Sequence, residues 1–272
     1  MSTRAIDNVE AAIARIEATD ARVNAFTART FERARTEAAA VDARGEPLGP
    51  LAGVPYAVKN LFDVQGLPTL AGSKINRDHP PATQDAVLVQ RLQAAGAVLL
   101  GALNMDEYAY GFTTENSHYG PAHNPHDLTR IAGGSSGGSG AAVAAGQVPL
   151  TLGSDTNGSI RVPASLCGVW GLKPTFGRLS RRGSYPFVHS IDHLGPMASS
   201  VGVLAAAYDA MQGPDALDPG CHATRVQATA PSLERGVNGL RIGLLGGYFH
   251  DLATAPAREV AKQAARALDA IE

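Results

Sequence analysis

The chain has 272 residues, with 23 Lys and Arg against 25 Asp and Glu, which gives a formal charge of −2 and an isoelectric point near 6.4. This near-neutral balance and the aromatic content of 6% argue against a nucleic-acid-binding protein, which usually presents a basic face and aromatic stacking platforms. With 44% hydrophobic residues and 30 glycines, the composition indicates a folded, compact, enzyme-like domain.

The first 50 residues predict a helical segment. Val9, Ile13 and Ile16 follow helical spacing and can share one face, and a second helix is expected over Phe31–Val41. A glycine- and proline-rich break follows at Gly45–Pro50. We therefore expect residues 1–50 to pack as a helical segment on a larger domain.

After this break the chain alternates between strand and helix patterns. The apolar run Val54–Val64 indicates a buried strand, Asp85–Ala95 an amphipathic helix, and Ala97–Asn104 a second strand. This order predicts an α/β fold with a mixed, mainly parallel sheet covered by helices. The later predicted elements are a short helix at Ala141–Gly146, a strand at Pro149–Asp155, a helix at Ser159–Gly168, a strand at Val169–Thr175, a helix at Val201–Met211, a strand at Leu240–Leu245 and a helix from about Ala255.

The last predicted helix continues to Glu272 without a stop signal. We therefore expect a single domain over residues 1–272 that is truncated at its C-terminus.

The glycine- and serine-rich run Gly133–Gly146 lacks the lysine of a phosphate-binding loop and the third glycine of a dinucleotide-binding loop. A flexible linker is also disfavoured, because an apolar helix and a strand follow at once. The GxSxG pattern of a hydrolase nucleophile elbow fits at both Ser135 and Ser136, with His189 or His193 as the base. This reading stays open, although HDLTRIA before the loop is a poor strand.

Lysine is rare, since the chain has only Lys59, Lys74, Lys173 and Lys262. Lys59 lies within the apolar run, where burial favours a neutral amine that can act as a general base. The alternative is that its side chain extends from the strand end to solvent.

The segment GSDTNGSIRVP predicts a strand, a tight turn and then a helix that begins near Ser159. Such a turn directs several backbone N–H groups to one point, which suits an oxyanion hole beside a serine nucleophile. An ordinary N-cap serine is the simpler alternative. Arg161 is expected to pair with a carboxylate, for which Asp155 is the candidate.

Six segments together resemble the amidase signature family: AGVPYAVKN, NMDEYAYG, TENSHYGPAHNP, GGSSGGSGAAVAAG, GSDTNGSIRVPASLCGVWGLKPTFGRLS and DHLGPM. The resemblance covers about residues 5–215 and implies an amidase signature fold and a Ser–cis-Ser–Lys triad without metal or organic cofactor. By motif match, Ser159 corresponds to the nucleophile, Ser135 to the bridging serine and Lys59 to the base. The resemblance also implies an oxyanion hole formed by the backbone N–H groups of Thr156, Asn157, Gly158 and Ser159. It further implies a substrate-binding surface formed by Asn157, Met105 and Gly134.

The chain departs from the family pattern at two positions. Asn157-Gly158 replaces the usual Gly-Gly turn, and asparagine is among the few other residues that tolerate positive φ. Ala132 stands where proline is common. The Asp192-His193 pair is then expected to be a structural turn near the site. His123, His126 and Asp127 could bind a metal ion, but the absence of an HExxH-type pattern favours an ordinary loop.

Within the family, the segments GLPTLAGSKI, NMDEYAYGFTTENSHYGP and SDTNGSIRVP resemble the carboxybiuret hydrolases most, and three substrate classes are considered. They are a small urea-like amide, as in the carboxybiuret hydrolases of cyanuric acid degradation, the glutaminase reaction of the A-type subunits of glutamyl-tRNA amidotransferases, and general carboxamides. A catalytically silent assembly subunit is the alternative outside enzymes. The implied partners are a small-molecule amide substrate, a second copy in a homodimer and a small accessory subunit, with no direct nucleic-acid partner.

Cys167 and Cys221 are too few for a disulfide framework and are expected to be small, buried or half-buried residues. The N-terminus resembles no signal peptide, and no run approaches the length of a membrane-spanning helix. We therefore expect a cytoplasmic protein with no membrane contact.

Overall fold

The computed structural model describes residues 4–45, 49–222, 225–237 and 239–268. The chain divides after Ala230 into two units. The first contains a six-stranded sheet with its helices, and the second contains α7 (Tyr248–Asp251) and α8 (Ala255–Ala267). No helix among the described residues is long and apolar enough to span a membrane.

The central sheet has the strand order β1-β3-β2-β8-β10-β9. Its inner strands β3, β2 and β8 are parallel, whereas β1, β10 and β9 pair antiparallel with their neighbours. The predicted α/β fold with a mixed sheet is therefore confirmed. In chain order the strands are β1 (Phe26–Arg29), β2 (Pro55–Lys59), β3 (Val98–Leu103), β8 (Leu150–Asp155), β9 (Trp170–Gly171) and β10 (His193–Ala198).

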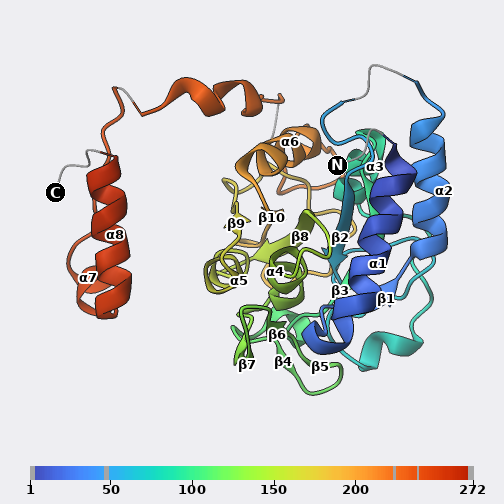
Figure 1. Ribbon diagram of the computed structural model, residues 1–272, viewed down its shortest axis with the longest axis horizontal. Coiled ribbons are helices and arrows are strands. Elements are labelled where there is room, and N and C mark those ends of the chain that lie inside the picture. The colour runs from blue at the N-terminus through green and yellow to red at the C-terminus, as the bar shows by residue number, and fades with distance from the viewer. Residues whose placement is uncertain (1–3, 46–48, 223–224, 238, 269–272) are drawn as a thin grey trace. The chain divides into compact units, whose positions relative to one another are not determined.

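Helices cover both faces of this sheet (Figure 1). Side chains of successive strand residues point to opposite faces, so Tyr56 and Val58 pack with α3 and α6, whereas Ala57 packs with α1, α2 and α4. The predicted apolar face of the first helix is confirmed, because Val9 and Ile16 are fully buried in the hydrophobic core on the face of the sheet that contains Ala57. The helices are α1 (Ala5–Val23), α2 (Phe31–Asp42), α3 (Val87–Ala94), α4 (Gly137–Ala144), α5 (Arg161–Cys167) and α6 (Val201–Met211).

Short elements connect the main ones. They are the 3-10 helices η1 (Ile75–Asp78), η2 (Glu107–Ala109) and η3 (Ala230–Arg235), and two ribbons formed by β4 (Glu115–Asn116) with β5 (Gly120–Pro121) and by β6 (His123–Asn124) with β7 (Asp127–Ile131). The segment HDLTRIA is therefore largely a strand, although its side chains are exposed and it lies outside the central sheet.

Several predicted boundaries were wrong. The helix expected at Ala141–Gly146 begins earlier, at Gly137, and the strand expected at Val169–Thr175 is reduced to two residues. Residues Leu240–Leu245 form no described strand. The helix expected from Ala255 is observed to Ala267, and residues 269–272 lie outside the described residues. The segment 1–50 also contains strand β1, which lies between the two predicted helices and pairs with β3 at the edge of the sheet.

The glycines at the start of α4 are required by close packing, not by flexibility. A Cβ at Gly138 would lie 2.5 Å from the carbonyl oxygen and 2.6 Å from the nitrogen of Asn104. Helix α4 thus lies directly against the backbone that follows β3. The two cysteines behave as expected, since both are free, Cys167 is buried and Cys221 is half-buried.

The fold brings distant segments together at one edge of the sheet. The parallel strands β2 and β8 end there with Lys59 and Asp155, and the antiparallel strand β10 begins there with His193 opposite Asp155. In open α/β sheets, ligands bind outside the carboxyl ends of the parallel strands. The predicted catalytic residues therefore belong to the edge at which a ligand is expected.

The close approach at Gly138 makes a stability prediction. We expect Gly138→Ala to lower the free energy of unfolding by about 1–3 kcal/mol, because the added methyl group overpacks against fixed backbone atoms. Urea denaturation measures the change. Gly202→Ala is the matched control, since Gly202 also lies in a helix but a Cβ added there would meet no atom within 4 Å, and it should be neutral or slightly stabilising. Equal effects of the two substitutions would contradict the packing argument.

Candidate active site

Lys59 is the last residue of β2 and has no exposed surface. Its ammonium form donates hydrogen bonds to Ser135 Oγ at 2.7 Å and to Ser154 Oγ at 2.9 Å. Burial lowers the pKa of Lys59 to about 7, and the nearby carboxylates of Asp106, Asp155 and Asp192 oppose this shift. The alternative of a side chain extended to solvent is therefore wrong, and a neutral amine is accessible near neutral pH.

Ser135 lies in the loop before α4, where it is fully buried. The Gly134–Ser135 peptide bond is cis, and the Ser135 carbonyl accepts a hydrogen bond from the Asp106 N–H at 3.2 Å. The Asp106 carboxylate in turn accepts from the Thr114 N–H at 3.0 Å. Hydrogen bonds from the segment 106–114 therefore stabilise this loop. The helix and strand patterns of the sequence did not predict that contact.

Gly134 and Met105, predicted to contact substrate, are both buried. A Cβ at Gly134 would lie 2.8 Å from the Thr113 nitrogen and 2.9 Å from the Thr114 nitrogen, so the position packs against backbone. The Met105 side chain is fully buried in the hydrophobic core. A core side chain presents no surface to a ligand, so the substrate-binding role of Met105 stays a prediction that depends on its backbone and not on its side chain.

Ser159 follows the turn after β8 and is 5% exposed. Asp155 organises this turn, since its carboxylate accepts hydrogen bonds from the N–H groups of Gly158 at 2.7 Å and Ile160 at 3.2 Å. Arg161 binds the same carboxylate through two nitrogens at 2.8 and 2.9 Å, which confirms the predicted pair. Burial alone would raise the pKa of Asp155, but hydrogen bonds from Arg161 and from these amides hold it below its usual value.

This arrangement corrects the predicted oxyanion hole. The Gly158 N–H already donates to Asp155, so it is not free to bind an oxyanion. The N–H groups of Thr156, Asn157 and Ser159 have no hydrogen-bond acceptor among the described residues, and they remain candidates. In the same part of the chain, the Ser159 hydroxyl has no hydrogen-bond partner, and none joins it to Ser135.

Asn157 needs no unusual backbone conformation. Positive φ occurs at Gly158, at 133°, and not at Asn157. Asparagine is therefore accommodated because its side chain is exposed, and the expected tolerance of positive φ is not used. An amide side chain next to the free N–H groups can contact a bound molecule.

A small cavity of about 150 Å³ lies beside Ser154, which contacts the lysine. Ser154, the second hydroxyl on Lys59, lines it together with Asp192 and the loop Tyr185–His189. Arg181 and Asp218 form an ion pair at 3.1 Å in its wall. The lining combines charged and apolar side chains, and a cavity of this volume has room for a small molecular group.

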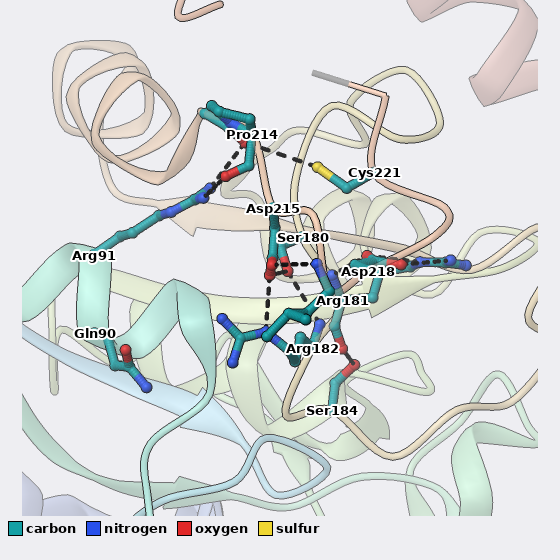
Figure 2. Close-up of polar contacts among 12 residues, drawn as sticks. Gln90, Arg91, Ser180, Arg181, Arg182, Ser184, Pro214, Asp215, Asp218 and Cys221 are labelled. Atoms are coloured by element: carbon teal, nitrogen blue, oxygen red, sulfur yellow. Dashed lines mark hydrogen bonds and ion pairs between the residues drawn. The ribbon is translucent and has the colours of Figure 1, made fainter. Parts of the chain in front are cut away.

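Two arginine–aspartate pairs lie near each other, and one of them, Arg181 with Asp218, lines this cavity (Figure 2). Asp215 binds Arg182 Nε at 3.0 Å and Ser180 Oγ at 2.6 Å, beside the pair formed by Arg181 and Asp218. Asp215 and Asp218 belong to the segment Gly213–Cys221, called the strap below. Arg91 donates to carbonyl groups of this strap, among them that of Pro214 at 2.9 Å. The strap from Gly213 to Cys221 is thus fastened along its length.

The alternative readings of the sequence find no support in the contacts. The Ser136 hydroxyl is buried and donates to the Ser154 carbonyl, and neither it nor Ser135 contacts a histidine among the described residues. His123 and His126 contact backbone carbonyl groups of Leu128 and Cys167. No cluster of three or more metal-ligating side chains occurs in the described ranges.

Three further residues contact the candidate site and were not predicted from the sequence. Ser154 is one of three polar residues in the fully buried strand β8, and a hydroxyl in such a strand was the available signal for a polar partner. Asp106 carries no such signal, since its role depends on contact with a distant loop. Asp192 was interpreted only as part of a turn, although it lies 2.5 Å from Thr156 Oγ1.

The buried lysine makes a prediction for stability against pH. Between the folded pKa of about 7 and the unfolded value of 10.5, the unfolded chain binds a proton that the folded chain lacks, so stability should rise with pH across this window. We expect the gain from about pH 7 to about pH 9 to be ~2 kcal/mol larger in the unmodified protein than in Lys59→Met. Urea unfolding at both pH values measures it. Identical pH dependence in the two proteins would contradict a neutral buried amine.

A family model described as Amidase matches residues 7–272. The AtzE subunit of 1-carboxybiuret hydrolase from Pseudomonas sp. (strain ADP) is 73% identical over 273 residues, which cover 99% of this chain and 60% of that protein. The A-type subunit of glutamyl-tRNA(Gln) amidotransferase from Anaeromyxobacter dehalogenans (strain 2CP-C) is 52% identical over 239 residues, which cover 87% of this chain and 48% of that protein. The chain thus spans about half to three fifths of the length of these relatives.

Solved structures agree with this relationship. One, described as an unexpected vestigial protein complex that reveals the evolutionary origins of an s-triazine catabolic enzyme, matches with a TM-score of 0.98 at 73% identity and covers 99% of this chain and 60% of that one. Native peptide amidase from Stenotrophomonas maltophilia matches with a TM-score of 0.89 at 35% identity, covering 98% of this chain and 58% of that one. From the family match over almost its whole length and from these identities, the chain belongs to the Amidase family.

Proposed function

We propose that this protein hydrolyses amide bonds through an acyl-enzyme, with Ser159 as nucleophile, Ser135 as bridging serine and Lys59 as base. The observation that carries the proposal is the contact of 2.7 Å between the fully buried Lys59 amine and the Ser135 hydroxyl. Burial lowers the pKa of Lys59 to about 7, which places a usable general base at the site near neutral pH.

In the proposed mechanism the neutral Lys59 amine accepts the Ser135 proton as Ser135 accepts the proton of Ser159. A hydroxyl suits the bridging position because it can donate and accept at the same time. The Ser159 oxygen then attacks the amide carbonyl, and the free N–H groups of Thr156, Asn157 and Ser159 stabilise the oxyanion. The relay returns a proton to the leaving amine, and water hydrolyses the acyl-enzyme to the acid and free Ser159.

The two serine hydroxyls are not hydrogen-bonded to each other in the described structure. Catalytic hydrogen bonds are often long in unliganded sites and tighten when substrate binds. We therefore place the closure of the Ser135–Ser159 contact at the substrate-bound stage. The mechanism uses no metal or organic cofactor.

As substrate we propose a small urea-like amide such as 1-carboxybiuret. The 73% identity with a 1-carboxybiuret hydrolase over 99% of this chain supports this choice, and so does the small cavity beside Ser154. A glutamyl-tRNA(Gln) amidotransferase A-type glutaminase is the second candidate, supported by 52% identity over 87% of the chain. The remaining alternatives are a general carboxamide amidase and a silent assembly subunit.

The proposal extends to organisation and partners. A matching solved structure is described as a protein complex, which supports assembly with an accessory subunit, and we also propose a homodimer. We treat residues 1–272 as part of one amidase domain with 1–50 as its N-terminal segment, acting in the cytoplasm.

The nucleophile assignment predicts that Ser159→Ala abolishes amide turnover and labelling by a fluorophosphonate probe. The thermal midpoint should change little, because the Ser159 hydroxyl makes no hydrogen bond in the described structure. Ser136→Ala is the matched comparison, and it should retain a labelled Ser159. Labelled-peptide mass spectrometry checks both. Retained turnover in Ser159→Ala, or a label on Ser136, would contradict the assignment and favour the elbow reading.

The exposed amide of Asn157 predicts a difference between substrates. Asn157→Gly should lower kcat/KM for biuret-type substrates by about 10-fold, the worth of one polar contact of ~1.4 kcal/mol. Activity on a plain aliphatic amide should stay equal or improve, because that substrate offers the side chain no polar partner. Steady-state kinetics on both substrates measures the contrast. A parallel response would show that Asn157 does not contact the substrate.

A further inference from the structure

Asp192 joins two segments of the site through both of its oxygen atoms. One oxygen accepts a hydrogen bond from the Thr156 hydroxyl at 2.5 Å. The other accepts from the N–H groups of Phe187 at 2.8 Å and Val188 at 2.9 Å. The residue is 9% exposed. A buried carboxylate with three donors is a structural junction. It joins the turn Thr156–Ser159, called the nucleophile turn below, to the loop Tyr185–His189 in the cavity wall.

The position of Asp192 follows from the sheet. It directly precedes β10, whose first residue His193 lies opposite Asp155 at the end of β8. The turn that begins with Thr156 leaves β8 at this same point. The start of one antiparallel strand is thereby placed beside the end of its neighbour.

The loop Tyr185–His189, which Asp192 binds, is also hydrogen-bonded to other segments at both of its ends. The Tyr185 N–H donates to the Leu61 carbonyl at 2.8 Å, and the Arg181 guanidinium donates to the His189 carbonyl. Arg181 is held by Asp218 in the cavity wall. The loop is therefore a fixed point against which another segment can be positioned.

The nucleophile turn is held in both of its halves. Asp155 holds the second half through the Gly158 and Ile160 amides, and the Ser159 carbonyl accepts a hydrogen bond from the Ser136 N–H at 3.3 Å. Among the described contacts, its first half is held only by the Thr156 hydroxyl on Asp192. Oxyanion donors act only when their N–H groups are directed accurately, so a loose first half would misdirect the Thr156 and Asn157 amides.

We propose that Asp192 is a positioning residue, which fixes the oxyanion-binding end of the nucleophile turn to the cavity wall through the Thr156 hydroxyl. The inference rests on the proposed function, since it assigns a task to the amides that would stabilise the oxyanion. Asp192 touches no reacting atom in this role and acts through Thr156.

Asp192 also carries charge near Lys59, and this second effect must be separated from positioning. The carboxylates of Asp106, Asp155 and Asp192 all raise the pKa of Lys59 against the larger effect of burial, and Arg161 is paired with Asp155. Removal of the Asp192 charge should therefore shift the pKa of Lys59 further down. Removal of the Thr156 hydroxyl leaves that charge in place.

The test uses the rate at which a fluorophosphonate probe labels Ser159 in the purified protein, followed against pH through neutrality. This reaction needs the oxyanion site but no knowledge of the amide substrate. We expect Thr156→Val to lower the plateau rate about 10-fold without moving the pH midpoint, and Thr156→Ser to restore the rate to within about 3-fold. Asp192→Ala should lower the rate by a similar factor and move the midpoint to lower pH.

A double variant tests whether the two residues act together. If Asp192 acts through Thr156, adding Thr156→Val to Asp192→Ala should change the rate by less than about 2-fold. Thr129→Val is the matched control, because Thr129 makes the same hydroxyl–carboxylate contact with Asp127 at 2.7 Å on the β7 ribbon, and it should leave the rate unchanged.

The outcomes distinguish the inference from the function on which it rests. If Ser159 of the unmodified protein is not labelled, the nucleophile assignment and the inference both fail. If it is labelled and Thr156→Val reacts at the unmodified rate, only the positioning role is overturned. A midpoint shift in Thr156→Val with an unchanged plateau would also overturn it, because it would place the effect on Lys59. The Thr156 pair decides the question even if Asp192→Ala does not fold.

Discussion

A lysine amine without access to water is the constraint around which this site is built. Lys59 ends a strand that is parallel to both of its neighbours and covered on both faces, so its side chain cannot reach solvent. A buried amine is tolerated only with polar partners or in its neutral form, and here both conditions operate. Ser135 and Ser154 supply the partners, and burial moves the pKa of Lys59 to about 7.

Three buried aspartates at the same sheet edge accept hydrogen bonds from the backbone of the loops that meet there. The loops that meet there carry backbone N–H groups removed from water, and such groups need acceptors. Asp106 accepts from Thr114, Asp155 from the turn 156–159, and Asp192 from the loop Tyr185–His189. Each carboxylate thus stabilises one loop, and together they place negative charge around Lys59. Loop architecture and the protonation of the lysine are therefore coupled by the same groups.

Much of the fold and part of the site could be predicted from local pattern. Buried strands, helices and free cysteines could be predicted because each depends on residue types close together in the chain. The lysine within an apolar run indicated a buried amine. The Arg161–Asp155 pair was also predictable, because both residues lie within one turn. The glycine- and serine-rich run was harder, since its glycines serve packing of α4 against Asn104 and the pattern alone could not place the start of the helix.

The sequence by itself determined which chemical groups are present and where many of the helices and the buried strands β2, β3 and β8 lie, because hydrophobic periodicity and local turns depend on neighbouring residues. Only the tertiary structure decided which groups meet. Ser154, Asp106 and Asp192 are distant in the chain from the residues they contact, and their roles arise from strand order and register. The same is true of the Gly158 amide, whose capture by Asp155 depends on the geometry of the turn. Contacts between segments are set by packing of the whole sheet, which no local pattern encodes.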